Sequence, residues 1–496
     1  MKKNLLYILA AGALLFSSCD AQLDVQPHGG TVTDEMLQEL VKHDADKVLA
    51  PMMLGMLNYM HNGYYYSDVN GQGFMCWNLG MDFQGNDMLI EDVTNYWKSE
   101  YQFINLRTQV SSFAASSWYC YYKMVYKANQ ILDLIPADAT GKAAIYKAQA
   151  LTFRSMAYYY LLNIYQDSYL HGGKDKAGVP MYLSTGDPTT GRTPVATVYA
   201  QITTDLQTAV SIFETEEYDA LSSVTDIDGA VANLVLARVA LTSAQFDIAA
   251  TAAGKVIDAG YSLMNEEQYT TSGFQDTTLP ETIWAYEWDM ATSLDNRSFA
   301  SWISKTAIDD GSNKGIYVMI DNQLYDQIAD TDYRKKNFTT EVTTATSADG
   351  TKTYTYPKYT NTKFDSETYR QDEIFMRLSE AYLLKAEAEA RNQKYTDAQQ
   401  TLFDLVSERD SAYAKSTKTG DDLLKEIHLQ SRIELWGEGH EWFTNKRFNV
   451  GVDRTKSTNH IHKVAIPAGK DFTYQIPLSI EINSNPNITD ADQNPL

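Results

Sequence analysis

The 496-residue chain is poor in cysteine and in positive charge. It has three Cys, so neither a fold held by many disulfides nor a zinc module built from several cysteines is expected. Lys and Arg total 41 against 64 Asp and Glu, a formal net charge of −23. Such a surface repels phosphate backbones and anionic headgroups, so we expect no nucleic-acid partner.

Motifs for nucleotide binding, for a nucleophile elbow and for catalytic zinc are also lacking. His440-Glu441 begins a His-Glu-x-x-His pattern, but Thr444 stands where the second His is required. His460 and His462 could share one side of a strand, yet no third ligand is suggested, which favours a surface loop. We therefore expect no cofactor and no metal.

A row of glutamates is the one pattern that invites a catalytic interpretation. Glu434, Glu438 and Glu441 fall at helical spacing, and two carboxylates could act as the acid and base of a glycoside hydrolase. On an acidic protein, however, such a row is more often a solvated or salt-bridged face. The sequence therefore favours a protein that is not an enzyme.

The N-terminus is typical of a secretory leader. Lys2 and Lys3 precede an apolar run over residues 5–16, which is too short to span a bilayer. Ser17, Ser18 and Cys19 follow, as in the lipid-attachment site of bacterial lipoproteins, although Phe16 stands where an aliphatic residue is usual. We expect residues 1–18 to be a signal peptide, Cys19 to be acylated (palmitate among its chains), and residues 19–30 to form a tether. The acyl chains would then be the only membrane anchor.

The other two cysteines, Cys76 and Cys120, are far apart in the sequence, which gives no geometric support for a disulfide. Buried thiols are the better interpretation.

Apolar spacing predicts a helical scaffold. The expected helices include one capped by Thr33 that runs to about residue 59, one that stops before Pro136, an Ala-striped pair ending at Gly260, and a pair over residues 377–388 and 398–405. Paired helices with Ala at their contacts resemble tetratricopeptide repeats. No fixed 34-residue period runs through the chain.

The middle of the chain, residues 262–370, is rich in Thr, Tyr, Asn, Asp and Gly and differs from the scaffold. Residues 283–289 alternate as a strand, on which we expect Trp284 and Tyr286 to face the core. Residues 341–357 predict a β-hairpin around Asp349-Gly350.

Several motifs resemble one known family. They are residues 126–132, residues 377–388, residues 432–443 with Lys446-Arg447, and the endings Ile476-Pro477 and Asn485-Pro486-Asn487. Together with Cys19 they strongly resemble the SusD/RagB family of Bacteroidetes outer-membrane lipoproteins. In that family the C-terminal motifs are structural, which implies a structural role for Arg377, Glu380, Arg432, Glu434, Glu438, His440 and Trp442.

The resemblance implies a mainly α fold of four tetratricopeptide-like helix pairs, with a variable Tyr-rich insertion of loops and short β-hairpins. We expect one domain over residues 31–496, with scaffold at about 31–261 and 371–450, insertion at about 262–370 and a loop-rich tail at about 451–496. The implied function is capture of oligosaccharides at the outer-membrane surface, without catalysis, and their delivery to a SusC-like TonB-dependent transporter. Peptide or glycoprotein capture, a glycoside hydrolase and a periplasmic tetratricopeptide scaffold are the alternatives.

Sugar binding would need exposed aromatic faces beside amide or charged groups. The 34 Tyr, against 17 Phe, suit such a surface. Two clusters are candidates: Trp77 with Tyr64, Tyr65, Tyr66 and Asn86, and Trp288 with Asn296, Arg297 and Trp302. The family offers no fixed motif for ligand residues, so these candidates rest on residue type and spacing alone.

Overall fold

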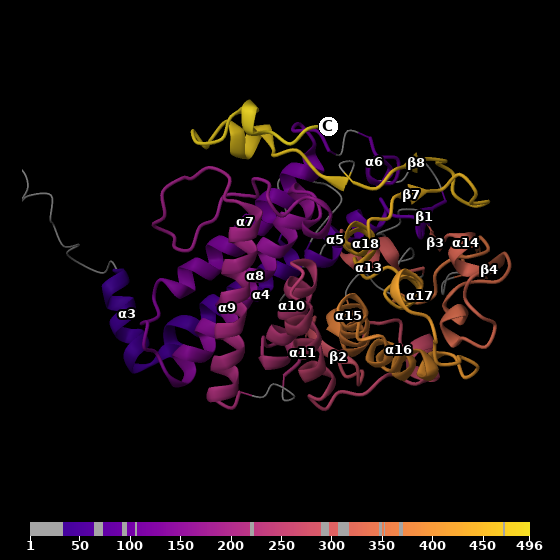
Figure 1. The fold of residues 1–496 in the computed structure, drawn as a ribbon, viewed down its shortest axis with the longest axis horizontal. Coiled ribbons are helices and arrows are strands. Elements are labelled where there is room, and N and C mark those ends of the chain that lie inside the picture. The colour runs from indigo at the N-terminus through magenta and orange to yellow at the C-terminus, as the bar shows by residue number, and fades with distance from the viewer. Residues whose placement is uncertain are drawn as a thin grey trace, which may run out of the picture.

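The computed structural model describes residues 33–63, 73–91, 97–104, 107–218, 223–288, 297–305, 317–346, 350–351, 353–366, 371–469 and 472–496. It is mainly helical, with short pairs of strands (Figure 1). The helices stand side by side across the molecule, and the C-terminal segment lies across one end of them. Among the described residues, no helix has the length and apolar character needed to cross a membrane.

Two helices, α3 (Asp34–His43) and α4 (Ala45–Asn62), form where the sequence predicts one. Thr33 caps α3 as predicted, with Oγ1 accepting from the backbone N–H of Met36 at 3.3 Å. The single long helix is wrong, because Asp44 leaves the helical conformation (φ −156°, ψ 82°) and separates the two.

The N-terminal scaffold continues through short and long helices, and from residue 112 onward each packs on the next helix along the chain. They are α5 (Phe74–Asp82), α6 (Lys98–Tyr101), α7 (Ser112–Leu132), α8 (Gly141–Tyr165), α9 (Val195–Thr215), α10 (Gly229–Thr242) and α11 (Phe246–Ile257). The predicted stop before Pro136 is confirmed, because α7 ends at Leu132. The Ala-striped pair is confirmed as α10 and α11, which pack closely together.

The C-terminal helices complete the same scaffold. They are α15 (Leu378–Arg391), α16 (Tyr395–Arg409), α17 (Gly420–Glu434) and α18 (Glu441–Phe448). Helix α15 packs against α10 and α11 as well as against α16 and α17. Buried alanines lie on both sides of this contact, among them Ala252 and Ala253 on α11 and Ala388 on α15. The two helical parts of the chain therefore join directly, although more than a hundred residues separate α11 from α15.

The intervening segment supplies small helices and several short strands. It contains α12 (Glu266–Thr271), β2 (Thr282–Tyr286), α13 (Phe299–Ile303), β3 (Val318–Ile320), α14 (Asn322–Tyr325), η3 (Tyr333–Asn337), β4 (Thr343–Thr346) and β5 (Thr353–Tyr356). The predicted hairpin is confirmed: β4 and β5 pair antiparallel, with Thr343 opposite Tyr356. Its turn residue Asp349 lies outside the described residues.

The other strands tie distant parts of the chain together. Strand β2 pairs antiparallel with β6 (Glu373–Arg377), and β1 (Met88–Ile90) pairs with β3. The tail forms β7 (Val452–Asp453), β8 (Ala465–Ile466), η5 (Leu478–Ile482) and η6 (Asp490–Asp492), while η1 (Tyr169–His171) follows α8. The β2–β6 pair places Tyr286 opposite Glu373, directly before the scaffold resumes at α15.

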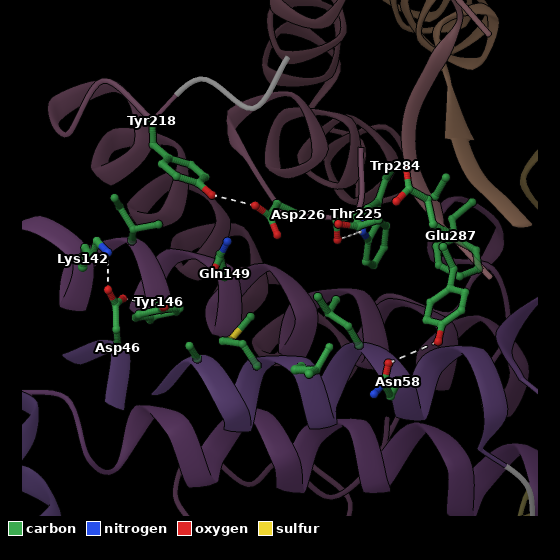
Figure 2. A pocket seen from close by; sticks show the side chains of 18 residues that line it. Asp46, Asn58, Lys142, Tyr146, Gln149, Tyr218, Thr225, Asp226, Trp284 and Glu287 are labelled. Carbon is green, nitrogen blue, oxygen red and sulfur yellow. Dashed lines mark hydrogen bonds and ion pairs between the residues drawn. The ribbon is translucent and has the colours of Figure 1, made fainter. Parts of the chain in front are cut away.

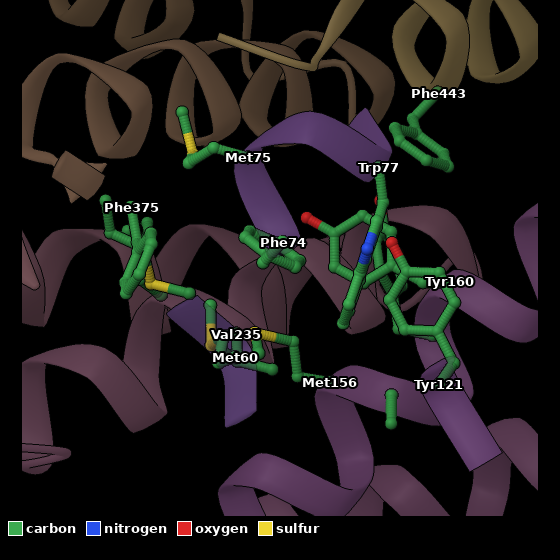
Figure 3. Packing of buried hydrophobic residues seen from close by; sticks show 14 of the residues in the cluster. Met60, Phe74, Met75, Trp77, Tyr121, Met156, Tyr160, Val235, Phe375 and Phe443 are labelled. Atoms are coloured by element: carbon green, nitrogen blue, oxygen red, sulfur yellow. The ribbon is translucent and has the colours of Figure 1, made fainter. Parts of the chain in front are cut away.

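The core beneath these elements is rich in aromatic and Met side chains (Figure 3). Trp77 lies within it, 3% exposed, between Phe74 and the rings of Tyr121 and Tyr160. The expectation that Trp77 presents an exposed face for sugar binding is therefore wrong. Gly73 (φ +84°) starts helix α5, and every residue from Phe74 to Asp82 is buried, so the segment forms a central helix.

Cys76 and Cys120 are both buried thiols, as predicted. The Sγ of Cys76 donates to the carbonyl oxygen of Arg297 at 3.3 Å.

Candidate ligand-binding pocket

A cavity of about 750 Å³ opens between α4, α8, the segment before α10, and the β2–β6 pair (Figure 2). Its volume lies within the range of about 300–1,000 Å³ that is typical of small-molecule sites. Asp46 and Asn58 rise from α4 below it, Tyr218 and Asp226 lie above, and Trp284 and Glu287 lie to the right. The other lining residues are Ala50, Met53, Leu54, Leu57, Lys142, Ile145, Tyr146, Gln149, Thr225, Ala285, Tyr286 and Phe375.

Three half-buried tyrosines shape the pocket, and each hydroxyl is bonded to a polar side chain. Tyr146 donates to Oδ1 of Asp46 at 2.9 Å, and Tyr218 donates to Oδ2 of Asp226 at 3.0 Å. Tyr286 donates to Oδ1 of Asn58 at a longer 3.4 Å. These bonds fix the direction of each ring, so the cavity has aromatic walls of defined orientation.

Burial and the adjacent Asp46 raise the pKa of Tyr146, and burial together with Asp226 raises the pKa of Tyr218. Both hydroxyls therefore remain protonated donors at neutral pH.

The charges in the lining are unequal. Asp46, Asp226 and Glu287 contribute carboxylates, whereas Lys142 contributes the ammonium among the lining residues and forms an ion pair with Asp46. Gln149 adds an amide, whose Nε2 donates to the carbonyl oxygen of Ile227 at 3.0 Å. The pocket thus offers mainly hydrogen-bond acceptors around aromatic and aliphatic walls.

A second hollow of about 800 Å³ lies between the α3–α4 junction and the segment that precedes α8. Apart from the imidazole of His43, no aromatic ring lines it, and its walls are mostly charged or aliphatic. It lacks the pairing of flat apolar faces with fixed polar groups that recognition of a small organic ligand requires.

The residues predicted from sequence lie elsewhere. Trp302 is 5% exposed on α13, with its ring edge-on to Trp97 at 5.7 Å between centroids. Its Nε1 donates to the carbonyl oxygen of Arg297 at 3.2 Å. Trp302 therefore packs in the core, and the expectation of an exposed Trp302 is wrong.

Trp288 is half-buried just after strand β2, and its backbone N–H donates to Asp372 at 2.9 Å.

Asn86 bonds to the C-terminal tail. Its Nδ2 donates to the carbonyl oxygen of Gly451 at 3.1 Å, and its Oδ1 accepts from the N–H of Asp453 at 2.7 Å. Neither Trp288 nor Asn86 lines the pocket.

Tyr64, Tyr65, Tyr66 and Asn296 lie outside the described residues, as does Cys19.

Sequence reasoning missed the pocket tyrosines. Trp284 is 1% exposed, as predicted for a core residue, but Tyr286, assigned to the core with it, is half-buried and lines the cavity. The available signal was the excess of Tyr over Phe, since a phenol suits a wall that meets both apolar and polar groups. It could not locate the site, because the lining comes from segments far apart in the chain.

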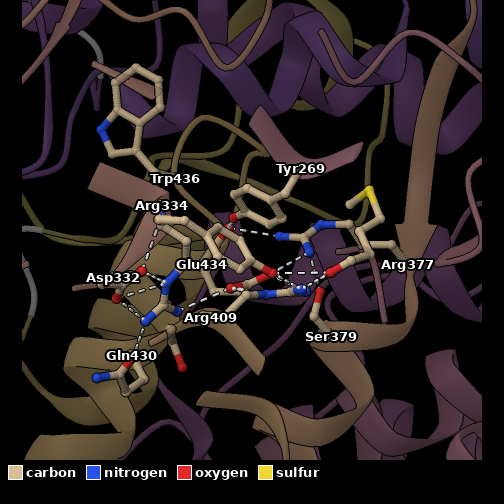
Figure 4. A network of polar contacts seen from close by, with 12 residues as sticks. Tyr269, Asp332, Arg334, Arg377, Ser379, Arg409, Gln430, Glu434 and Trp436 are labelled. Atoms are coloured by element: carbon tan, nitrogen blue, oxygen red, sulfur yellow. Dashed lines mark hydrogen bonds and ion pairs between the residues drawn. The ribbon is translucent and has the colours of Figure 1, made fainter. Parts of the chain in front are cut away.

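The glutamate row has a different environment (Figure 4). Glu434 is fully buried and accepts from Arg377 at 2.6 Å, Arg334 at 3.0 Å and Arg409 at 3.1 Å. Burial alone would raise the pKa of Glu434, but the three guanidinium groups hold it well below its ordinary value. Glu281 bridges Arg377 and Arg409 on the same side.

Glu438 extends this network. Its carboxylate accepts from Arg377 at 2.7 Å and from Lys363 at 2.6 Å. Burial opposes ionisation, yet these two cations lower the pKa of Glu438 to about 2. Glu434 and Glu438 therefore share Arg377 inside the protein instead of facing a ligand.

Glu441 lies apart, in a second buried cluster. It accepts from the backbone N–H of Asp87 at 3.1 Å, and Asp87 forms an ion pair with Arg432. Next to it, Asp82 accepts from the N–H groups of Gly439 at 2.7 Å and Glu441 at 3.0 Å. Burial raises the pKa of Asp82 to about 7 in spite of these bonds.

The remaining motif residues are also internal. Arg238 and Glu380 form a buried two-pronged ion pair at 2.5 and 2.6 Å, and His440 lies beside Glu380 at 3.9 Å. Burial lowers the pKa of His440 to about 4. Trp442 is 1% exposed and packs on Phe472 with 4.6 Å between ring centroids.

Across the described residues, no group of three His, Cys, Asp or Glu side chains is arranged to hold a metal ion.

Two family profiles match most of the chain between them. One, described as "SusD family", matches residues 251–496, and the other, described as "Starch-binding associating with outer membrane", matches residues 23–241. Among curated proteins, none matches the sequence.

Solved structures share the fold at low sequence identity. A SusD-like carbohydrate binding protein from Bacteroides vulgatus ATCC 8482 is 24% identical, with a TM-score of 0.75 over 90% of this chain and 98% of that one. A SusD superfamily protein from Bacteroides thetaiotaomicron VPI-5482 is 21% identical, with a TM-score of 0.71 over 90% and 100% of the two chains. Surface glycan-binding protein A from Bacteroides thetaiotaomicron is 16% identical, with a TM-score of 0.68 over 91% of this chain and 99% of that one.

Proposed function

Because the chain belongs to the SusD family, we propose that it is a cell-surface binding protein that captures oligosaccharides without cleaving them. The observation that carries this proposal is the pocket between α4, α8 and β2, where tyrosine rings stand beside carboxylate and amide groups. The likeness to a SusD-like carbohydrate binding protein and to a surface glycan-binding protein supports the same role.

The chemistry of a sugar matches this lining. A pyranose ring has apolar C–H faces that stack on a flat aromatic ring, and hydroxyls around its edge that need acceptors and donors. Tyr146, Tyr218 and Tyr286 supply the rings. Asn58 and Asp226, each bonded to one of those tyrosines, supply polar groups at the edge.

The charge of the lining restricts the ligand. With three carboxylates and one ammonium, the pocket repels an acidic sugar and suits a neutral one, whose hydroxyls donate to the carboxylates. We therefore expect the ligand to be a neutral oligosaccharide.

The experiment is calorimetric titration of the purified mature lipoprotein, in a detergent without a sugar headgroup, with maltoheptaose, xylohexaose, mannohexaose, polygalacturonate and a mixture of peptides. At least one neutral oligosaccharide is expected to bind and to be recovered intact after overnight incubation. Binding of peptides alone would replace the glycan proposal with peptide capture. Cleavage of any oligosaccharide would contradict a non-catalytic role.

Membrane anchoring is proposed through Cys19, which follows an apolar run and two serines. Acyl chains on this residue would hold the protein at the outer membrane, where it would pass its ligand to a SusC-like TonB-dependent transporter. Replacing Cys19 with Ala should release the protein from membranes or leave it unprocessed. Retention of the Ala variant after salt and carbonate washes would contradict the anchor, and failure to co-purify with a SusC-like barrel would contradict the transfer step.

A further inference from the structure

Tyr286 stands in an unusual setting for a pocket residue. Its ring lies parallel to the imidazole of His61, with 3.6 Å between centroids and 6° between planes. His61, near the end of α4, is fully buried, whereas Tyr286 is half-buried and lines the cavity. One face of the phenol ring is therefore covered by protein while the ring still borders the pocket.

The imidazole is itself held at its edge by a carboxylate. Nδ1 of His61 lies 3.1 Å from Oε2 of Glu373, whose side chain is 1% exposed. Glu373 is the antiparallel neighbour of Tyr286 in the β2–β6 pair. Glu373 thus holds the imidazole at its edge, and the imidazole in turn covers one face of the Tyr286 ring at the pocket wall.

The pairing of His61 with Glu373 is an energetically costly way to fill the space behind Tyr286. Nε2 of His61 is buried and has no hydrogen-bond partner within the described structure, which costs stability. An aliphatic side chain at either position would fill the same volume without burying a carboxylate or an imidazole nitrogen. What the pair does provide is a flat, fixed support beneath the Tyr286 ring.

We propose that Tyr286 is the platform on which a sugar ring stacks in this pocket, and that His61 and Glu373 are positioning residues that hold it. This inference rests on the proposed function and assigns the residue that contributes most to affinity. A ring that is already fixed loses little conformational entropy when a ligand stacks on it, so its contact energy appears in the affinity.

The surroundings of the platform fit a sugar edge. Asn58 meets the Tyr286 hydroxyl from α4, and the next residue along the strand, Glu287, is exposed and also lines the pocket. Trp284 also borders the cavity, but it is 1% exposed and its Nε1 donates to the carbonyl oxygen of Thr225 at 3.3 Å, so it offers a ligand little surface. A pyranose over Tyr286 would have an amide and a carboxylate beside its hydroxyls.

The test distinguishes three contributions of Tyr286 to binding: the flat ring, the hydroxyl and the volume of the side chain. It uses the mature lipoprotein and the neutral oligosaccharide from the panel above that binds the wild type most tightly. Tyr286→Phe keeps the ring and should hold the dissociation constant within about threefold. Tyr286→Ala and Tyr286→Leu remove the flat face and should weaken binding by about tenfold or more. Leu retains much of the volume, so it separates lost stacking from lost packing.

The support is tested separately. Glu373→Gln keeps an oxygen that can accept from Nδ1 of His61, so binding should stay close to that of the wild type. Glu373→Ala removes the hydrogen-bond partner of His61 and should weaken binding. If Glu373 acted only through its charge, Glu373→Gln would weaken binding as much as Glu373→Ala does. Tyr126→Ala is the matched control: this tyrosine is 45% exposed on α7 and does not line the pocket, so affinity should not change.

Failure of the Tyr286 proposal can be distinguished from failure of the proposed function. If a neutral oligosaccharide binds and Tyr286→Leu, still folded by its melting curve, binds equally well, the platform is overturned and glycan capture stands. If no oligosaccharide binds the wild type, both proposals fall.

Discussion

The Glu434 network and the pocket are built from the same kinds of residue, but they use them in opposite ways. Around Glu434, three arginines converge on one carboxylate, and Tyr269, Gln430 and a second glutamate close the shell (Figure 4). In the pocket, tyrosines and carboxylates also meet, yet they surround about 750 Å³ of open space. Residue type does not separate a structural cluster from a binding site; what separates them is whether the polar groups and ring faces are enclosed by protein or border open space.

The energetic consequences differ as well. A buried ion pair is strongly destabilised when one partner is removed, because the remaining charges stay uncompensated. A side chain on a pocket wall can be removed with little loss of stability, since solvent replaces it. Stability and affinity should therefore respond to different substitutions in the two regions.

The largest effect is expected in the network. Glu434→Ala leaves Arg377, Arg334 and Arg409 facing one another in the interior and should lower the free energy of unfolding by about 5 kcal/mol. Urea unfolding followed by circular dichroism measures this. Glu408, exposed on the neighbouring α16, is the control, and its Ala variant should stay within about 0.5 kcal/mol of the wild type. Equal stability of the two variants would remove the distinction between network and surface.

Trp77→Ala tests the core beneath α5. Because Trp77 is 3% exposed, truncation should leave a cavity and cost about 3–5 kcal/mol. The affinity of the molecules that remain folded should be unchanged, since Trp77 does not line the pocket. Parallel melting curves and titrations check this pair of results. Weaker binding with an unchanged melting temperature would instead place Trp77 in the site.

Acid is expected to weaken the Glu434 network through Glu438. Arg377 and Lys363 lower the pKa of Glu438 to about 2 in the folded state, against an ordinary 4.5. The folded state thus binds fewer protons than the unfolded state between these values. The stability that Glu438 contributes is complete above about pH 4.5 and declines by about 3 kcal/mol as the pH falls to about 2.

Urea unfolding at several pH values measures this loss, and Glu438→Gln should flatten the curve below about pH 4.5. Asp82 acts in the opposite sense: its raised pKa of about 7 makes stability fall as the pH rises from about 4 to 7. Asp82→Asn should remove this fall in stability between about pH 4 and 7 and leave the loss of stability below about pH 4.5 unchanged. If the loss of stability below about pH 4.5 were the same in Glu438→Gln as in the wild type, other carboxylates would be responsible for it.

The smallest effect is expected for salt on binding. Stacking and hydrogen bonds to a neutral sugar involve no pairing of opposite charges, so affinity should vary less than about twofold between low and high salt. Titration of one oligosaccharide at both ionic strengths is sufficient. A steep loss of affinity with added salt would point to a charged ligand group.

Local signals in the sequence predicted the scaffold well. The Thr33 cap, the stop before Pro136, the Ala stripes of α10 and α11, and the β4–β5 hairpin each depend on neighbouring residues, and each is confirmed. The pocket depends on contacts between α4, α8, the segment before α10 and β2, which no local pattern encodes. Trp77 was misplaced because nearby glycines suggest a loop, although the uncharged stretch that follows Gly73 indicates a buried helix.

The most direct test is a crystal structure of the protein with a bound neutral oligosaccharide. We expect sugar density in the pocket between α4, α8 and β2, with a pyranose face against Tyr286 and its hydroxyls bonded to Asn58, Asp226 or Glu287. Sugar bound on another surface, with this pocket empty, would contradict this expectation.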